Sequence, residues 1–550
     1  MAHGSTLVAW YPQRVRRVCL LLLAFIAGAC GPSCDRSPVT PSANEPVPLR
    51  RGIGGEPTSL DPQRARGTFS FEVLRDLFEG LTTEGPNGEV VPGVAEDWSA
   101  SPDGLRYEFR LRGNARWSNG DPVTAEDFIA GLRRAVDPAT GAPGAALLGL
   151  IRNAPAVISG RLAPNELAVS AQGPRALLIE LSRPAPYFTA ILANAVAYPM
   201  HRGTHATGPD GSRANTPLVS DGPYRLVEWT PGLKLRLVRN ANYWGAREVG
   251  VGTIEYLPMA DSNAELARYR ADALDVTSSV PTQQLDGLRS SVPSELQIRP
   301  QLSVVYYAFN LARPPFNTSA GLREALSLAV DREVLTGSVL RAGQVPAYSF
   351  VPPGISGYAG PAYAWSSEPK EQRLARARTL YAAAGFTTVH PLRVRLLIPT
   401  DDTLRKVALA VAAMWHESLG VETAMIDREY RAFLATRDDR TQWDVVSHGW
   451  NADYQDPGNF LDIFTASGPQ NDAGLADPEF DRLMTGAAAT ADASRRTEQL
   501  GQAERRLLDV YAVAPLYFPV SRRLVKPRVR GAILGPMNHN YSKYLRVAAP

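Results

Sequence analysis

The chain has 550 residues, of which 44% are hydrophobic, 21% charged and 8% aromatic. This composition is typical of a folded protein with a sizeable core, and it excludes disorder over most of the length. The 58 Lys and Arg residues nearly balance the 55 Asp and Glu residues, and no dense basic block occurs, so nucleic acid is not an expected partner.

The first 30 residues have the order of an export signal. Arg14, Arg16 and Arg17 precede an uncharged apolar run over 18–29, which is too short to span a bilayer as a helix. We therefore predict a signal peptide over 1–30 and a location in the periplasm or on the outer face of the cell envelope.

Residues 26–30 read IAGAC and resemble a bacterial lipobox, in which the cysteine is lipid-modified. Cys30 is thus the expected lipidation site, and the lipid would be the only attachment to a membrane. Ala27 stands where the lipobox usually has Leu, so ordinary cleavage nearby stays an alternative. Residues 31–49, rich in Pro and Ser, are predicted to be a flexible linker. No cysteine follows Cys34, so the folded body must depend on core packing.

The body alternates strand and helix patterns. Residues 105–111 place Leu, Tyr, Phe and Leu on one face and charges on the other, which is typical of a half-buried strand. Further strands are predicted over 176–181, 233–238, 302–309 and 392–398. Helices are predicted to begin at a capping box over 124–127 and to occupy 320–340, 405–419 and 494–511. We expect an α/β protein with mixed sheets.

Motifs of catalysis and metal binding are missing. The sequence contains no G-x-S-x-G elbow, no Walker A loop and no G-x-G-x-x-G motif. His201 and His205 have no neighbouring Glu, and the surrounding Gly and Pro indicate a loop, so we expect no metal and no cofactor. A secreted peptide hydrolase would need a nucleophile with its base, which no motif supplies; we predict that the protein is not an enzyme.

Several blocks in a fixed order carry a family resemblance. They are EPTSLDP at 56–62, the segment 77–134, SDGPYRLVEWTPGLKLRLVRNANYWG at 220–245, YYAFNLARPPFN at 306–317, LREALSLAVDREVL at 322–335, VPAYSFVPPG at 345–354 and GWNADYQDPGNFL at 449–461. They resemble the peptide and oligopeptide solute-binding proteins that supply bacterial ABC importers. The resemblance covers roughly residues 50–545.

This resemblance implies a periplasmic-binding-protein-like α/β fold with two lobes joined by a hinge and three domains. Domain I would be discontinuous, over 50–67, 201–302 and 520–550, with domain II over 68–200 and domain III over 303–519. A monomer is expected, which would capture oligopeptides between the lobes and deliver them to the permease subunits of an importer. The alternative is a receptor of the same fold for another solute, such as a murein peptide, an oligosaccharide or a metal chelate.

The resemblance also implies site residues. Asp453, in the motif Trp450 to Tyr454, would hold the peptide's α-amino group by a charge-assisted hydrogen bond; a turn Asp before Pro457 is the alternative. Backbone groups of Gly449 and Asn451 would pair with the ligand in the manner of an added strand. The residues expected around the side-chain pockets are Trp450, Tyr306, Tyr430 and Glu56, although each aromatic could equally be a core residue.

The sequence departs from the family at two places. Ser447 stands where the oligopeptide binders carry an Arg near the ligand's carboxyl end, so Arg437, Arg341 or His448 would have to supply the basic group. Ser303 and Asn451 stand at the positions of a disulfide in a close relative, in agreement with the absence of cysteine from the body.

Overall fold

The computed structural model describes residues 47–202, 218–466, 468, 470–531 and 535–548. The predicted signal peptide with Cys30, most of the predicted linker, and His205 lie outside these residues. Leu49, which we predicted to be the last linker residue, is instead buried and begins strand β1. Among the described residues, no helix is both long and apolar enough to cross a bilayer.

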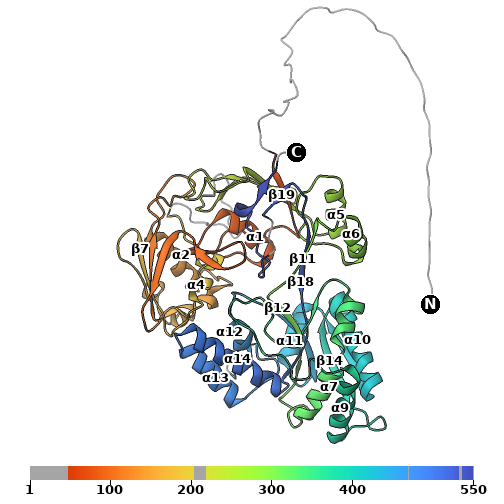
Figure 1. Ribbon diagram of the computed structural model, residues 1–550. Helices are drawn as coiled ribbons and strands as arrows, with labels where there is room; N and C mark the ends of the chain where they lie inside the picture. Colours follow the sequence, from red (N-terminus) through yellow and green to blue (C-terminus); the bar gives the residue numbers. More distant parts are fainter. Residues whose placement is uncertain (1–46, 203–217, 467, 469, 532–534, 549–550) are drawn as a thin grey trace, which may run out of the picture. The chain divides into compact units, whose positions relative to one another are not determined.

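The first half of the chain forms two four-stranded sheets (Figure 1). One has the order β1 (Leu49–Ile53), β10 (Thr253–Pro258), β9 (Lys234–Arg239) and β8 (Tyr224–Thr230), and the other has the order β4 (Ala95–Ala100), β5 (Arg106–Leu111), β7 (Ala176–Glu180) and β6 (Val169–Ala171). Side chains of both sheets meet in one hydrophobic cluster, which includes Leu49, Phe109 and Ile254 and is called here the first core.

A six-stranded mixed sheet organises the second half. Its order is β13 (Val345–Pro346), β17 (Val513–Phe518), β12 (Ser303–Phe309), β16 (Val445–Asn451), β14 (Arg393–Pro399) and β15 (Glu422–Arg428). The three strands β14, β15 and β16 are parallel, and the other pairs are antiparallel, so the predicted mixed sheets are confirmed.

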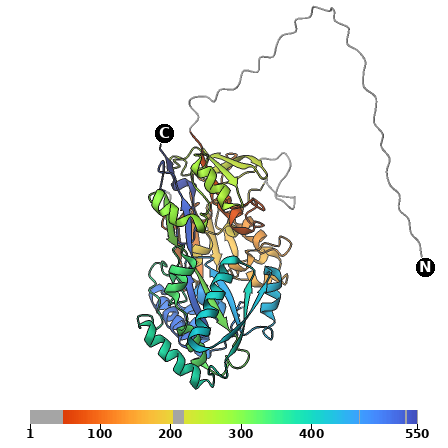
Figure 2. The same cartoon turned by 90° about the vertical axis from the view of Figure 1, so that its right-hand side faces the viewer.

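Both faces of this sheet are covered, as a parallel sheet requires. Alternate residues of β12 point to opposite sides: Tyr307 joins a cluster with Trp415, the second core, whereas Tyr306 joins a cluster with Phe433, the third core. Trp415 belongs to α10 (Asp402–Leu419) and Phe433 to α11 (Tyr430–Asp438), so these helices cover opposite faces. Figure 2 shows α10, in teal, beside the strands of this sheet.

Strands β11 (Leu296–Pro300) and β18 (Val520–Leu524) carry the chain between the two halves and pair antiparallel with each other. The remaining two-stranded sheets are β2 (Thr82–Glu84) with β3 (Val90–Pro92), and β19 (Val529–Arg530) with β20 (Arg546–Val547).

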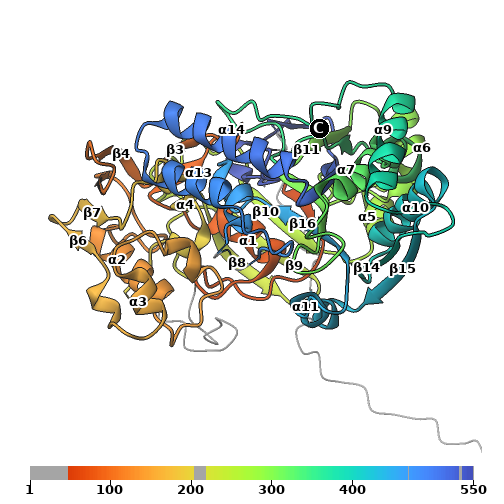
Figure 3. The same ribbon diagram turned by 90° about the horizontal axis from the view of Figure 1, so that it is seen from below.

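The other α-helices are α1 (Gly67–Leu77), α2 (Ala125–Val136), α3 (Ala154–Ile158), α4 (Phe188–Ile191), α5 (Ser262–Arg270), α6 (Leu285–Ser291), α7 (Ala320–Leu328), α8 (Arg332–Val334), α9 (Lys370–Ala383), α12 (Gly458–Leu461), α13 (Pro478–Ala489) and α14 (Ala493–Asp509). Short 3₁₀ turns are η1 (Ala145–Leu148), η2 (Pro164–Glu166), η3 (Ala195–Ala197), η4 (Thr282–Gln284), η6 (Asp462–Phe464) and η7 (Ser542–Tyr544), and η5 (Leu335–Leu340) is a π-helical turn. Figure 3 shows α13 and α14 side by side.

Most local predictions are confirmed. In β5, Tyr107, Phe109 and Leu111 are buried and the residues between them are exposed. The carboxylate of Asp127 accepts a hydrogen bond of 2.8 Å from the backbone N–H of Thr124, as a capping box requires. Helix α10 ends before Gly420, whose φ of 79° lies in the left-handed region that glycine adopts without strain.

The predicted continuous helix over 320–340 is wrong. Helix α7 ends at Leu328, and a new turn begins after Asp331, whose side chain accepts a hydrogen bond from the backbone N–H of Val334. The break turns Arg332 inward, where it is fully buried and donates to the carbonyl oxygens of Ala347 and Pro515. Apolar spacing continues through the break, which is why periodicity alone predicted one helix.

Candidate functional site

Strand β16 places the motif Trp450 to Tyr454 at the carboxyl end of a central strand. Trp450 and Asn451 are the last two residues of the strand, and Asp453 follows two residues after its end. Along its whole length β16 pairs with β12, from Ser303 opposite Asn451 to Phe309 opposite Val445. The carboxyl ends of parallel strands are the usual place for ligands in open α/β sheets.

The other edge of β16 is open over its second half. Strand β14 pairs with β16 only at Val445 and Val446. Within the described residues, no strand pairs with the edge of residues 447–451 that faces away from β12. Backbone N–H and C=O groups on an unpaired edge are a template for an added strand.

Gly449 and Asn451 lie on this open edge, and both are exposed. A Cβ atom on Gly449 would meet Val304 O at 3.5 Å, which is an ordinary contact. The position therefore tolerates other residue types, in agreement with a role for the backbone and not the side chain.

Asn459 holds the motif in place. Its Oδ1 atom accepts hydrogen bonds from Trp450 Nε1 at 3.1 Å and from the backbone N–H of Asp453 at 3.0 Å. Asn459 is only 6% exposed, so both bonds are shielded from competing water. Sequence reasoning missed this residue, although it lies in the block 449–461 that carried the family resemblance.

Asp453 is exposed to solvent, although protein atoms surround much of its carboxyl group. The partial loss of water raises the pKa of Asp453 above its ordinary value, and a hydrogen bond with Asn459 opposes this rise. No ion pair with Asp453 occurs in the described part of the chain. An exposed, partly desolvated and unpaired carboxylate is suited to bind a cation that arrives with a ligand.

Trp450 and Tyr454, on either side of Asp453, pack into different cores. Trp450 is partly buried against the third core, whereas Tyr454 packs against the first core. Asp453 therefore lies at the boundary between the two halves of the fold, where a ligand can contact both.

Arg437 and His448 converge on a buried carboxylate that the sequence did not indicate. Asp472, 6% exposed, lies 2.6 Å from His448 Nδ1 through its Oδ2 and 3.5 Å from Arg437 Nε through its Oδ1. The hydroxyl of Tyr306 lies 3.2 Å from the same His448 nitrogen. No motif surrounds Asp472, so only the fold could reveal that it joins this cluster.

Tyr306 is itself fully buried between Phe350 and Phe464. Tyr306 is therefore a core residue that orients His448, and it does not form the wall of an open pocket. Core packing was the alternative that the sequence left open for this residue. Tyr430, in contrast, is 63% exposed at the start of α11, with its ring stacked on Phe433.

Glu56 and Arg341 have other partners. The carboxylate of Glu56 accepts hydrogen bonds from Trp229 Nε1 at 2.6 Å and from the backbone N–H of Gly232 at 3.0 Å, so it fastens the loop after β1 to the β8–β9 hairpin. Arg341 forms an ion pair of 2.8 Å with Asp286 on α6. Neither residue forms a hydrogen bond or ion pair with another candidate residue in the described part of the structure.

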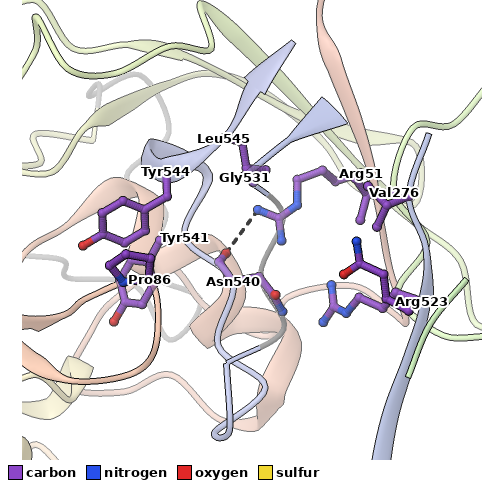
Figure 4. Close-up of a pocket in the computed structure, with 11 residues that line it drawn as sticks. Arg51, Pro86, Val276, Arg523, Gly531, Asn540, Tyr541, Tyr544 and Leu545 are labelled. Atoms are coloured by element: carbon purple, nitrogen blue, oxygen red, sulfur yellow. Dashed lines mark hydrogen bonds between the residues drawn. The ribbon is translucent and has the colours of Figure 1, made fainter. Parts of the chain in front are cut away.

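A separate pocket lies at Arg51 and Arg523, next to β19 and β20 (Figure 4). Its volume of about 30 Å³ has room for a water molecule or two and not for a peptide. Arg51 donates to the carbonyl oxygen of Asn540, and both guanidinium groups bind Glu72. These bonds tie the C-terminal segment to the first core, and the pocket contains none of the predicted site residues.

Residues 89–472 match the family described as bacterial extracellular solute-binding proteins, family 5. The chain belongs to this family. It is 34% identical to the periplasmic oligopeptide-binding protein OppA of Salmonella typhimurium, over 96% of this chain and 97% of that protein.

Solved structures give the same result. The unliganded open form of the periplasmic murein tripeptide-binding protein MppA superposes with a TM-score of 0.83 at 34% identity, over 91% of this chain and 97% of that one. Haemophilus influenzae OppA in complex with the peptide RPPGFSPFR gives 0.74 at 33% identity, over 91% and 99%. The chain shares the two-lobed α/β fold of these proteins, and the matched family consists of solute-binding proteins and not of enzymes.

Proposed function

We propose that the protein is the extracytoplasmic receptor of an ABC importer for short peptides, which it binds and releases without chemical change. The observation that carries this proposal is the open edge of β16 at residues 447–451, which ends beside the unpaired carboxylate of Asp453. An added strand would use main-chain hydrogen bonds that every peptide can make, and its ammonium end would meet Asp453.

The cluster of His448, Arg437 and Asp472 is the proposed site for the ligand's carboxylate. His448 lies in β16 five positions before Asp453, and an extended chain rises about 3.3 Å per residue. A peptide lying along this edge with its amine at Asp453 would bring its carboxylate to the level of His448 after about four or five residues. The proposal therefore favours short peptides.

Calorimetric titration with tri-, tetra- and pentaalanine tests this function, with mass spectrometry of ligands that co-purify with the protein. Binding of free peptides, and loss of binding when both ends are blocked, is the expected result. Failure of every peptide to bind would remove the proposal.

A murein peptide is the second candidate ligand. The observation that favours it is the high structural similarity to the murein tripeptide-binding protein, and the cell wall offers peptides in the same compartment. Titration with murein tripeptide beside trialanine distinguishes the two, since a murein receptor would bind the first far more tightly.

We further propose that Cys30 carries a lipid anchor and that domain I comprises 50–67, 201–302 and 520–550, with domain II over 68–200 and domain III over 303–519. The lipobox-like residues 26–30 support the anchor. The passage of the chain through β11 and β18 supports a discontinuous first domain. Release of a Cys30→Ala variant from the membrane fraction is the test for the anchor.

A further inference from the structure

Tyr187 joins the first core to the segment that follows β16. It stands at the N-terminal boundary of α4 and is 7% exposed. Its ring lies parallel to that of Tyr454, with 5.0 Å between the centroids and 1° between the planes. Because Tyr454 directly follows Asp453, this stack restrains the chain one residue beyond the proposed amine-binding carboxylate.

Arg496 of α14 strengthens this link. Its guanidinium carbon lies 4.6 Å from the centre of the Tyr187 ring, which is a cation–π distance. The same guanidinium binds both carboxylate oxygens of Asp456, at 2.6 and 2.7 Å, and both residues are buried. Tyr187 thus contacts Tyr454 directly and reaches Asp456 through Arg496.

The ion pair of Arg496 with Asp456 leaves no room for a side chain at residue 458. A Cβ atom on Gly458 would lie 2.7 Å from Asp456 Oδ1 and 2.9 Å from Arg496 Nη2.

The side chain of Gln455 also donates to the carbonyl oxygen of Gly88, which precedes β3. Residues 454–456 are therefore bound at each position to a group outside their own loop.

We propose that Tyr187 is a positioning residue for Asp453. Trp450 anchors one side of Asp453 in the third core, and the stack on Tyr187 anchors the other side against the first core. A carboxylate held in place before the ligand arrives loses less conformational freedom on binding, which increases affinity. The inference rests on the proposed capture of the ligand amine by Asp453.

The test compares Tyr187→Leu with Tyr187→Phe by calorimetric titration of trialanine and N-acetyl-trialanine. Leucine removes the stack, whereas phenylalanine keeps it and removes only the hydroxyl. We expect Tyr187→Leu to weaken binding of the free amine about two- to tenfold, with a smaller loss for the acetylated peptide, and Tyr187→Phe to bind like the wild type. Tyr454→Leu should reproduce the effect from the other side, which guards against misfolding of one variant; circular dichroism checks the fold of each.

Asp453→Asn is measured in parallel, alone and combined with Tyr187→Leu. Non-additive losses for the free amine would support the inference, because they show that both residues act on one contact. Equal losses for the two peptides in Tyr187→Leu would overturn it, since the stack would then act on binding in general. If Asp453→Asn itself fails to discriminate between the peptides, the proposed role of Asp453 fails instead, so the two failures are distinguishable.

Discussion

Nδ1 of His448 lies 2.6 Å from Oδ2 of the buried Asp472. The close carboxylate and the hydroxyl of Tyr306, 3.2 Å from the same nitrogen, restrict the orientation of the imidazole ring. The geometry leaves Nε2 as the ring atom for other partners, and no hydrogen bond to it forms within the described residues.

His448→Gln is expected to weaken binding of tetraalanine about tenfold, because a charge-assisted hydrogen bond to the ligand's carboxylate contributes on the order of 1.5 kcal/mol. C-amidated tetraalanine lacks this carboxylate and should bind both proteins alike. Calorimetric titration of the two peptides measures the difference. A loss of the same size for the amide would show that His448 acts through packing only.

Asp453→Asn is expected to weaken binding of free-amine peptides far more than that of N-acetylated ones, since asparagine cannot pair with an ammonium ion. The raised pKa of Asp453 adds a pH dependence. The ammonium needs the ionised carboxylate, so affinity should be full at neutral pH and fall as acidification passes the pKa. Because the pKa lies above the ordinary 3.8, the fall should begin at a higher pH than for a typical aspartate. Titrations between pH 4 and 7 measure it, and a pH-independent affinity would contradict it.

Glu504 gives a prediction for stability. It is fully buried on α14 and accepts hydrogen bonds of 2.8 Å from the backbone N–H groups of Phe350 and Val351 and another from the hydroxyl of Tyr358. No cation balances its charge among these contacts, and burial raises its pKa to about 7. The folded protein therefore binds a proton here that the unfolded chain releases above its ordinary pKa of 4.5.

The contribution of this proton to stability is complete below pH 4.5 and is lost as the pH rises through about 7. The free energy of unfolding of the wild type should thus fall by about 2 to 3 kcal/mol more than that of Glu504→Gln between pH 5 and 8, because glutamine has no proton to lose. Urea unfolding at both pH values measures this difference. If the free energy of unfolding changed by the same amount in both proteins between these pH values, the raised pKa of Glu504 would be contradicted.

Ser303 and Asn451 are direct partners in the β12–β16 pair. Antiparallel partners have Cα atoms about 4.5 to 5.5 Å apart, which lies within the range that a disulfide can bridge. The double variant Ser303→Cys, Asn451→Cys should therefore close a disulfide in air and stabilise the fold by about 2 to 4 kcal/mol. Thiol titration and melting with and without reductant are the measurements, and the double alanine variant is the control. Free thiols in the folded, oxidised sample would contradict the register.

Local patterns were sufficient for many elements. The alternation in β5 and the capping box before α2 depend on neighbours within a few residues, so their structure follows from the order of side chains. The break after α7 does not follow from local patterns. Arg332 is turned inward by carbonyl oxygens from residues 347 and 515, and their positions are set by strands distant in sequence.

The candidate site divides in the same way. The motif from Trp450 to Tyr454 is continuous in the sequence, so Asp453 and its neighbours could be predicted as a group. Asp472 and Tyr187 have no motif around them, and the fold alone brings one to His448 and the other to Tyr454. The fold also showed that Tyr306 is buried and that Glu56 accepts a hydrogen bond from Trp229.

By itself, the order of residues predicted an export signal and determined the α/β class, the family and the motif that contains the amine-binding candidate, because each depends on short stretches of chain. The tertiary structure alone decided which edge of β16 stays open and which distant side chains hold the motif in place. These features depend on contacts between strands and helices that are tens to hundreds of residues apart in the sequence, and the packing of the cores determines those contacts.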